Sequence, residues 1–238
     1  KKGVNNAIRN LDNLSRSAGK ALGAVGAAVG GGLALSVREF GKFDSAMNQS
    51  IAIMGDVSDS MRNEMSEAAR EVAKNTTFSA EQAAESFFFL ASAGLSAEQS
   101  VGAMPQVAAF AQAGMFDMAT ATDLATDAQS ALGLVSEDTQ TNLDNLTRVT
   151  DVFVKANTLA NTSVEQLATA LTTKAGNALK TVGKDVEEGA AALAVFADQG
   201  IKGERAGTLL TNTIFGLTDI MKKAPEEAER LGIEVFNA

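Results

Sequence analysis

Three groups of closely spaced carboxylates are the side chains in this sequence that could take part in chemistry. They are Asp185-x-Glu-Glu188, Glu226-Glu-x-Glu229 and Asp123-x-x-x-Asp127. Paired carboxylates catalyse glycoside hydrolysis or bind hard cations. None of the groups has the Asp-x-Asp-x-Asp-Gly loop of a calcium hand, and the first two lie where a helix N-terminus favours negative charge. We therefore interpret all three as solvated charges, and we predict no metal site.

The composition limits the chemistry further. The 238 residues include no His, Cys, Trp or Tyr. Without imidazole or thiol groups the chain lacks a base near neutral pH, a thiolate nucleophile and the usual soft-metal ligands. The glycines of Gly200-x-x-Gly203-x-x-x-Gly207 are not followed by the Gly-Lys-Ser/Thr of a phosphate loop. We predict a nonenzymatic protein with no catalytic residue and no cofactor; an enzyme that works through carboxylates is one rival, but no substrate is indicated.

Charge is distributed unevenly along the chain. The net charge is −9, yet residues 1–43 carry seven basic and two acidic side chains. Between Lys74 and Arg148 there is no basic residue, and the acidic ones there are Glu81, Glu85, Glu98, Asp117, Asp123, Asp127, Glu137, Asp138 and Asp144. Such a surface repels phosphate, so we predict no specific nucleic-acid binding. Only the N-terminal arm could meet an anionic surface.

The elements that must position these side chains are helices. Ser79-x-x-Gln82, Ser96-x-x-Gln99 and Ser163-x-x-Gln166 are capping boxes, which mark helix N-termini. Glycines that could end the preceding helices are Gly94, Gly114, Gly133, Gly183 and Gly200. The predicted helices lie near 79–93, 96–113, 117–132, 136–160, 163–181, 185–199, 204–222 and 225–231. Pro105 should kink or split the second of these, and residues 233–236 are the one strand candidate.

Part of this helical pattern occurs twice. Ser79-Ala-Glu-Gln82 through Phe110-Ala-Gln-Ala-Gly114 recurs as Ser163-Val-Glu-Gln166 through Phe196-Ala-Asp-Gln-Gly200. The offset is 84 residues for the first motif and 86 for the second, so we expect a two-residue insertion between helices. We predict an all-α fold with two regions. A basic, Gly/Ala-rich helical arm spans 1–55, and a multi-helix core of short Gly-terminated helices spans 56–238, with duplicated copies at about 79–134 and 163–218.

The arm contains one apolar segment, residues 21–35. Lys20 and Arg38 enclose 17 uncharged residues, at the lower limit for a helix that crosses a bilayer. Its glycines favour a flexible or closely packed helix instead, and a membrane-entering segment is the alternative. The apolar residues that would face the membrane are Ala21, Leu22, Val25, Val29, Leu33 and Leu35.

A second apolar pattern follows this segment. Near-heptad spacing links Leu33, Val37, Phe40, Phe43, Met47, Ile51 and Met54. Such a seam indicates either self-association with another helix or burial against the rest of the same chain. Three consecutive rings, Phe87-Phe-Phe89, point about 100° apart on a helix. That helix is therefore either enclosed on several sides or offers one ring to a partner.

Several segments resemble the core of phage tail tape measure proteins. They are Phe43-Asp-Ser-Ala-Met47, Phe78-Ser-Ala-Glu-Gln-Ala-Ala84, Ala93-Gly-Leu-Ser-Ala97, Gly200-Ile-Lys-Gly-Glu-Arg-Ala-Gly-Thr-Leu-Leu210 and Glu229-Arg-Leu-Gly-Ile-Glu-Val-Phe236. The last two are the most specific. The similarity runs from about Phe40 to the end, and the basic arm before it is also similar to what precedes the family core. The chain opens on Lys1 without a Met and has no terminating signal, so we expect a fragment.

The resemblance implies a function. Such proteins occupy the lumen of a phage tail tube, set tail length through their helical region and leave ahead of the DNA at genome delivery. Implied partners are tail tube proteins, tail assembly chaperones and tail tip or baseplate hub proteins, together with three or six copies of the chain itself and contact with the host inner membrane. Implied locations are the virion tail lumen and, during assembly, the host cytoplasm. The rival is a membrane-active, pore-forming helical protein that acts through residues 21–35.

Overall fold

The computed structural model describes residues 39–232. Two compact units divide the chain, Lys1–Ser45 and Ala46–Ala238. The described residues contain helices and no strand, which confirms the all-α prediction. The apolar segment 21–35, most of the N-terminal arm and the strand candidate 233–236 lie outside the described residues.

The helices lie close to their predicted positions. A first helix is described over residues 39–54. The others are α2 (Asp59–Asn75), α3 (Ala80–Ser92), α4 (Ala97–Gly114), α5 (Met118–Ala131), α6 (Thr139–Leu159), α7 (Val164–Ala170), the π-helix η1 (Leu171–Ala175), α8 (Gly176–Thr181), α9 (Val186–Asp198), α10 (Gly203–Lys223) and α11 (Pro225–Arg230). The predicted helix 163–181 is therefore three pieces, with a π-helical turn in the middle.

Helix N-termini are set by side-chain caps. The three predicted capping boxes at Ser79, Ser96 and Ser163 are confirmed, and Asp185 with Glu188 forms a fourth. Ser58, Asp117 and Asp138 also accept a hydrogen bond from the backbone N–H three residues later. Each such cap satisfies a donor that the helix leaves free and stabilises it by about 1 kcal/mol.

Helix C-termini agree with the predictions at most positions. Gly94, Gly133, Gly183 and Gly200 have φ values between 70° and 92°, as left-handed caps require. The prediction for Gly114 is wrong, because α4 includes it and Met115 takes the left-handed conformation with φ 59°. A Cβ at Gly114 would lie 1.9 Å from the ring of Phe116, so this glycine makes room for a ring.

Pro105 lies inside α4 and does not split it, so of the two predicted outcomes the split is wrong and the kink remains a prediction. The proline is exposed, whereas its neighbours Met104 and Val107 are buried. Water can therefore solvate the carbonyl that loses its hydrogen bond, while buried contacts hold the helix on both sides of the proline.

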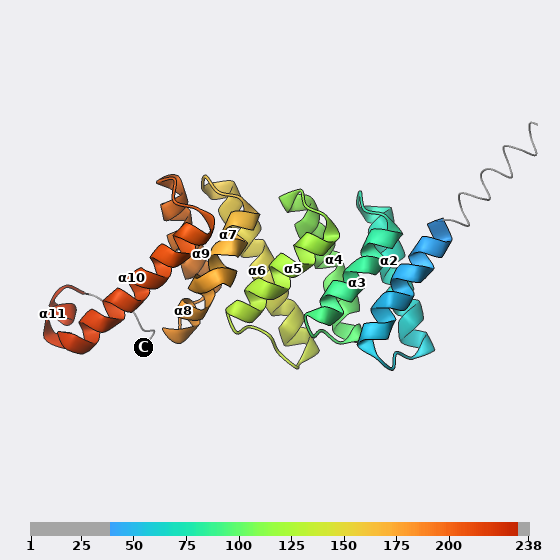
Figure 1. Ribbon diagram of the computed structural model, residues 1–238, viewed down its shortest axis with the longest axis horizontal. Coiled ribbons are helices and arrows are strands. Elements are labelled where there is room, and N and C mark those ends of the chain that lie inside the picture. Colours follow the sequence, from blue (N-terminus) through green and yellow to red (C-terminus); the bar gives the residue numbers. More distant parts are fainter. Residues whose placement is uncertain (1–38, 233–238) are drawn as a thin grey trace, which may run out of the picture. The chain divides into compact units, whose positions relative to one another are not determined.

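The helices of the larger unit form two rows of antiparallel hairpins. The first row consists of α3, α5, α7–η1–α8 and α10, and the second of α2, α4, α6 and α9. Each helix packs on the next helix of its own row and on its neighbours in the other row. Figure 1 shows the alternating direction of successive helices. This is the packing of helical repeat arrays, in which each hairpin contacts mainly the hairpins beside it.

The hairpin spacing accounts for the offset seen in the sequence. First-row helices have their N-caps at residues 79, 117, 163 and 202, and second-row helices at 58, 96, 138 and 185. The two copies of the Ser-x-Glu-Gln motif, 84 residues apart, are therefore separated by two hairpins. The structural unit is one hairpin, and the longer duplication remains a prediction.

The core lies between the rows. Its fully buried large side chains include Phe87, Phe110, Phe153, Met65, Met104, Met118, Leu146, Leu167, Leu171 and Leu193. Each side chain of this size stabilises the fold by about 1.5–3 kcal/mol when it leaves water. The Phe110 ring lies 5.6 Å from that of Phe116 and 6.4 Å from that of Phe153, so α4 and α6 share an aromatic contact.

Candidate functional site

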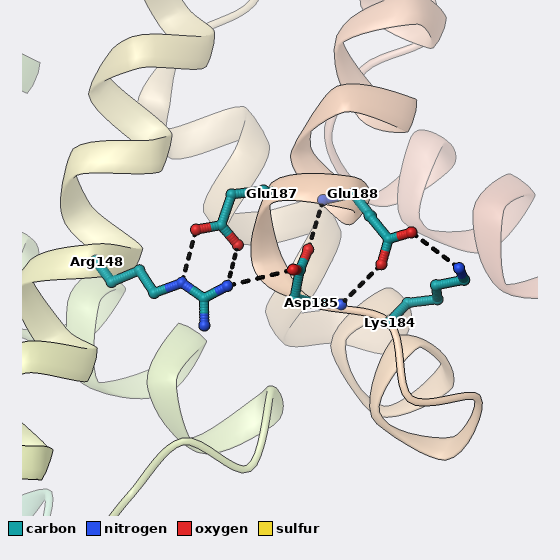
Figure 2. Close-up of polar contacts among 5 residues, drawn as sticks. All are labelled: Arg148, Lys184, Asp185, Glu187 and Glu188. Carbon is teal, nitrogen blue, oxygen red and sulfur yellow. Dashed lines mark hydrogen bonds and ion pairs between the residues drawn. The ribbon is translucent and has the colours of Figure 1, made fainter. Parts of the chain in front are cut away.

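The first carboxylate group lies at the start of α9, where it meets Arg148 of α6. Figure 2 shows the Arg148 guanidinium donating to both carboxylate oxygens of Glu187 and to Asp185. The Arg148 Nε to Glu187 Oε1 distance is 2.6 Å, and the Nη2 to Asp185 Oδ2 distance is 3.3 Å. A bidentate pair of this kind fixes the geometry of both side chains. It ties two second-row helices together.

The remaining members of the group serve the helix end. Asp185 Oδ1 accepts from the Glu188 N–H at 2.9 Å, and a Glu188 carboxylate oxygen accepts from the Asp185 N–H. Lys184 donates to Glu188 at 2.9 Å. The hydrogen bonds that Arg148 donates to Glu187, together with the charges of Glu187 and Asp185, raise the pKa of Arg148 despite partial desolvation. Every carboxylate in the group therefore has a cationic or backbone partner.

The other two carboxylate groups differ from the first. On α11, Glu227 pairs with Arg230, and that bond lowers the pKa of Glu227. On α5, burial and then the charges of Asp127 and Asp117 raise the pKa of Asp123. Across residues 39–232, no group of three or more acidic side chains is placed to hold a metal ion.

A buried network of amides joins α4, α5 and α6, and the sequence did not reveal it. Gln129 Nε2 donates to the carbonyl and the side-chain oxygen of Asn142, each at 2.9 Å. Asn142 Oδ1 also accepts from the Ser136 N–H, and Gln99 donates to the Ser136 carbonyl at 3.2 Å. Gln129 lies among the buried residues of α5. A polar residue on an otherwise apolar helix face was the feature of the sequence that could have indicated this network. The network holds the loop between α5 and α6 in place.

Above this network lies an open cleft of about 540 Å³. Its apolar wall includes Ile53, Leu95 and Val135, and its polar wall includes Gln99 and Asn142. Gln99 and Asn142 belong to the amide network, and Ser96, Ser136 and Glu137 also line the cleft. The lining is therefore a mixture of polar and apolar side chains.

The predicted seam is only partly described. Leu33 and Val37 lie outside the described residues. In the smaller unit Phe40 is 62% exposed, and in the larger unit Met47 is 2% exposed while Ile51 and Met54 are half-buried. Three residues after Met47, Ser50 Oγ donates to the Ala84 carbonyl of α3 at 2.9 Å. Phe43 and Met47 are thus buried within the chain, and the seam as a self-association surface remains a prediction.

The three consecutive phenylalanines have unequal environments. Phe87 is fully buried, Phe89 is half-buried and Phe88 is 37% exposed. The rings of Phe88 and Phe89 meet edge to face at 5.6 Å beside a groove of about 340 Å³. Helix α3 is thus not enclosed on every side, and one ring is accessible.

The membrane prediction falls on residues that the structure does not describe, since Ala21, Leu22, Val25, Val29, Leu33 and Leu35 all precede residue 39. Among residues 39–232, no helix has the length and apolar character that a bilayer crossing requires.

Comparison with known proteins identifies the family. The family model described as "Phage-related minor tail protein" matches residues 66–238. The match begins in the middle of α2 and includes every later helix of the array. This chain belongs to that family of phage tail proteins. The resemblance predicted from the sequence is therefore confirmed.

One relative gives this tail protein a more specific similarity. This chain is 30% identical over 205 residues to the tape measure protein of Pneumococcus phage Dp-1, and the match covers 86% of this chain. The match covers only 17% of that relative. No solved structure matches the tail protein.

Proposed function

We propose that this protein is a structural tape measure protein, which sets the length of a phage tail from inside the tail tube and is released at genome delivery. The observation that carries the proposal is the 30% identity to a tape measure protein over 86% of the chain. The paired or capping carboxylates and the helical array fit a structural role without catalysis.

Within that function, the described array suits anchoring better than measuring. An extended helix rises about 1.5 Å per residue, whereas successive packed helices lie about 8–10 Å apart. A hairpin of 38 residues, such as the one from Ser79 to Phe116, would span about 57 Å if it were one extended helix. In a packed row it advances the array by about 10 Å. We infer that most of the measuring length lies outside residues 39–232.

The proposed partners rest on the similarity to tape measure proteins. They are tail tube proteins, tail assembly chaperones, tail tip or baseplate hub proteins, and three or six copies of the same chain. The proposed locations are the virion tail lumen and, during assembly, the host cytoplasm.

Tail length is the test. Deleting residues 79–162 in frame removes two hairpins and lets Ser163 take the place of Ser79 as a helix cap. We expect assembled tails of unchanged length in electron micrographs, whereas an equal deletion from a helical region outside the array should shorten them by about 130 Å. If neither deletion changes tail length, the measuring function is wrong. If the array deletion itself shortens tails by about 130 Å, these helices lie extended in the tail.

Contact with the host inner membrane is a separate proposal and rests on the 17 uncharged residues between Lys20 and Arg38. The pore-forming alternative rests on the same segment. Leakage of a dye from anionic liposomes, abolished by Val25→Asp with Val29→Asp, would support this role; no leakage at any pH would contradict it.

A further inference from the structure

Among the described residues, the longest connection between two helices is the loop from α5 to α6. It spans residues 132–138, whereas the loops 55–58, 93–96 and 182–185 at the same edge of the array have four residues each. In helical repeat arrays, additional loop residues collect on one face, which is often the face that binds a partner. The loop 132–138 is therefore the place in this array to look for a binding site.

This longer loop forms part of the cleft of about 540 Å³. A volume of this size lies within the range of ligand pockets, which combine apolar walls with a few polar groups. Ile53 and Val135 are 45% and 56% exposed, so the apolar part of the cleft is open to solvent. The loop 132–138 contributes Val135, Ser136 and Glu137 to the lining, and the loop 93–96 contributes Gly94, Leu95 and Ser96.

Hydrogen bonds fix the orientation of the Asn142 amide, which lines the cleft and is 1% exposed. Its Oδ1 accepts from Gln129 Nε2 and from the Ser136 N–H, each at 2.9 Å. The Nδ2 group therefore points away from these two donors, and it has no acceptor within residues 39–232. In that range the fully buried side-chain N and O atoms without a hydrogen bond are limited to Ser100 Oγ. Asn142 Nδ2 is thus accessible, and its two hydrogens are available to a molecule in the cleft.

Gln99 adds a second amide with an available hydrogen. It is 7% exposed, its Oε1 accepts from the Ser96 N–H, and its Nε2 uses one hydrogen to donate to the Ser136 carbonyl. The hydroxyl oxygens of Ser96 and Ser136 each accept from a backbone N–H, which leaves their own hydrogens to donate. The polar part of the cleft is therefore rich in donors that a ligand with acceptor oxygens would satisfy.

The charge of the cleft favours neutral acceptors over anionic ones. Glu137 is the one charged side chain in the lining, and no basic residue occurs between Lys74 and Arg148. A carboxylate or phosphate in the cleft would lie near a like charge, with no cation from the lining to pair with it. Amide carbonyls carry acceptor oxygens without this repulsion, and a polypeptide presents them together with apolar side chains.

We propose that this cleft binds an uncharged, apolar peptide segment of a partner protein. The amides of Asn142 and Gln99 donate to main-chain carbonyls of the segment. An aliphatic side chain of the segment packs against Ile53, Leu95 and Val135. Main-chain hydrogen bonds combined with a side-chain pocket are a common way to recognise a peptide. The choice of a polypeptide over another neutral amide rests on the proposed structural function, whose partners are proteins.

Photo-crosslinking tests the proposal. The probe is a neutral tripeptide, acetyl-alanyl-photoleucyl-alanine N-methylamide, and the comparison is the same peptide with a free carboxylate. We expect saturable cross-links from the neutral peptide to residues 91–96 and 135–137, mapped by mass spectrometry, with at least 5-fold less from the anionic peptide. Glu137→Gln should reduce that difference between the peptides. Val135→Asp should lower the yield from the neutral peptide at least 5-fold, whereas Val195→Asp, at a site 63% exposed and outside the cleft, should not.

Absence of cross-links in the cleft would overturn the proposal, and so would a higher yield from the anionic peptide. A yield that falls as the protein concentration rises would also overturn it, because a second copy would then occupy the cleft. If a variant fails to fold, the two peptides still give the comparison on the unsubstituted protein. Failure of the ruler proposal appears instead in tail length, which this experiment does not measure.

Discussion

The two regions that share a sequence motif, residues 79–134 and 163–218, show how similar helical units can be built with different internal spacing. Both begin with a Ser/Gln capping box, continue through a left-handed glycine to a second capped helix, and then turn into a third helix. Corresponding positions are offset by 84 residues at the first cap (Ser79 and Ser163) and by 89 at the second (Ser96 and Asp185). At the third cap (Asp117 and Lys202) the offset is 85.

The extra residues therefore lie inside helices. The first helical segment of the second region, α7–η1–α8, is longer than α3, and it contains the π-helical turn. Its second helix, α9, has 13 residues where α4 has 18. The expected two-residue insertion between helices is thus wrong: two larger changes of opposite sign nearly cancel. A π turn is one way for a helix to hold extra residues while both its ends stay packed.

Charge separates the two regions further. Residues 79–134 carry six acidic and no basic side chains, whereas residues 163–218 carry six acidic and five basic ones. The first region thus repels anions along its length, and the second can form ion pairs such as that of Lys184 with Glu188. The two regions can therefore pack in a similar way despite different surface charges, because exposed charges contribute little to the free energy of folding.

The largest expected contrast concerns the repeated phenylalanine. Phe110→Ala should destabilise the protein by about 3–5 kcal/mol, because it leaves a cavity beside Phe116 and Phe153. Phe196→Ala should cost less than half as much, since Phe196 is only half-buried. Urea unfolding followed by circular dichroism measures both. Equal losses would mean that the second region is as tightly covered as the first.

The next contrast is the helix crossing at Gly207. A Cβ on Gly207 of α10 would lie 2.2 Å from the carbonyl oxygen of Ala170, where η1 begins. The residue of the first region that corresponds to Gly207, 85 positions earlier, is the buried Thr122. Helix α5 therefore packs with a side chain at this position, whereas α10 packs with none. Gly207→Ala should therefore destabilise by about 1–3 kcal/mol. The matched control is Gly216→Ala on the same helix.

Gly216 has no atom within 4 Å of the Cβ position. Its replacement by Ala should stabilise α10 by about 0.5–1 kcal/mol, because glycine is a poor helix former. Thermal unfolding of the two variants gives opposite shifts in Tm if the close approach at Gly207 is real. A neutral Gly207→Ala would show that α10 lies farther from η1.

Local rules predicted much of the fold because helix ends depend on a few neighbouring residues. Ser79, Ser96 and Ser163 cap helices where the capping-box spacing places them, and four of the five glycines end helices as expected. The failures at Gly114 and Pro105 have tertiary causes. The Phe116 ring packs against Gly114, and α4 continues through Pro105 with buried neighbours on both sides of the proline.

The candidate site was less predictable for the same reason. Asp185 and Glu188 were assigned to a helix end correctly, but the sequence could not pair Glu187 with Arg148, 39 residues away on another helix. The two-row hairpin array was likewise hidden, because the motif spacing of 84 residues corresponds to two hairpins and not to one.

Capping is expected to have a smaller effect in both regions. Ser79→Ala and Ser163→Ala should each cost about 1 kcal/mol, and Ser→Asp at either position should restore most of it. The number of residues that lose protection from hydrogen exchange should differ between the two variants. Helix α7 has only seven residues before the π turn, so hydrogen exchange should increase through η1 in Ser163→Ala. In Ser79→Ala it should increase only in the first turn of α3; matching patterns would show that η1 is no weaker than an α-helix.

The smallest effect concerns Asp123, whose counterpart 85 residues later is the uncharged Thr208. Burial and the charges of Asp127 and Asp117 raise the pKa of Asp123 in the folded protein. A raised carboxyl pKa means that the ionised form opposes folding above that pKa, and that the penalty disappears as pH falls below the unfolded value. Asp123→Asn should therefore stabilise the protein at pH 7 by about 0.5 kcal/mol or less, because water screens this exposed group.

The same change should have no effect near pH 3, where Asp123 is protonated in both states. Asp117, on the same helix, provides the opposite sign. The Thr120 backbone N–H lowers its pKa, so its contribution to stability is present at neutral pH and disappears as pH falls through the folded pKa. Asp117→Ala should thus lose stability at pH 7 and recover toward wild type in acid. Urea midpoints measured from pH 3 to 7 for wild type and both variants distinguish the two effects. If both variants follow the pH dependence of the wild type, neither carboxyl has a shifted pKa in the folded protein.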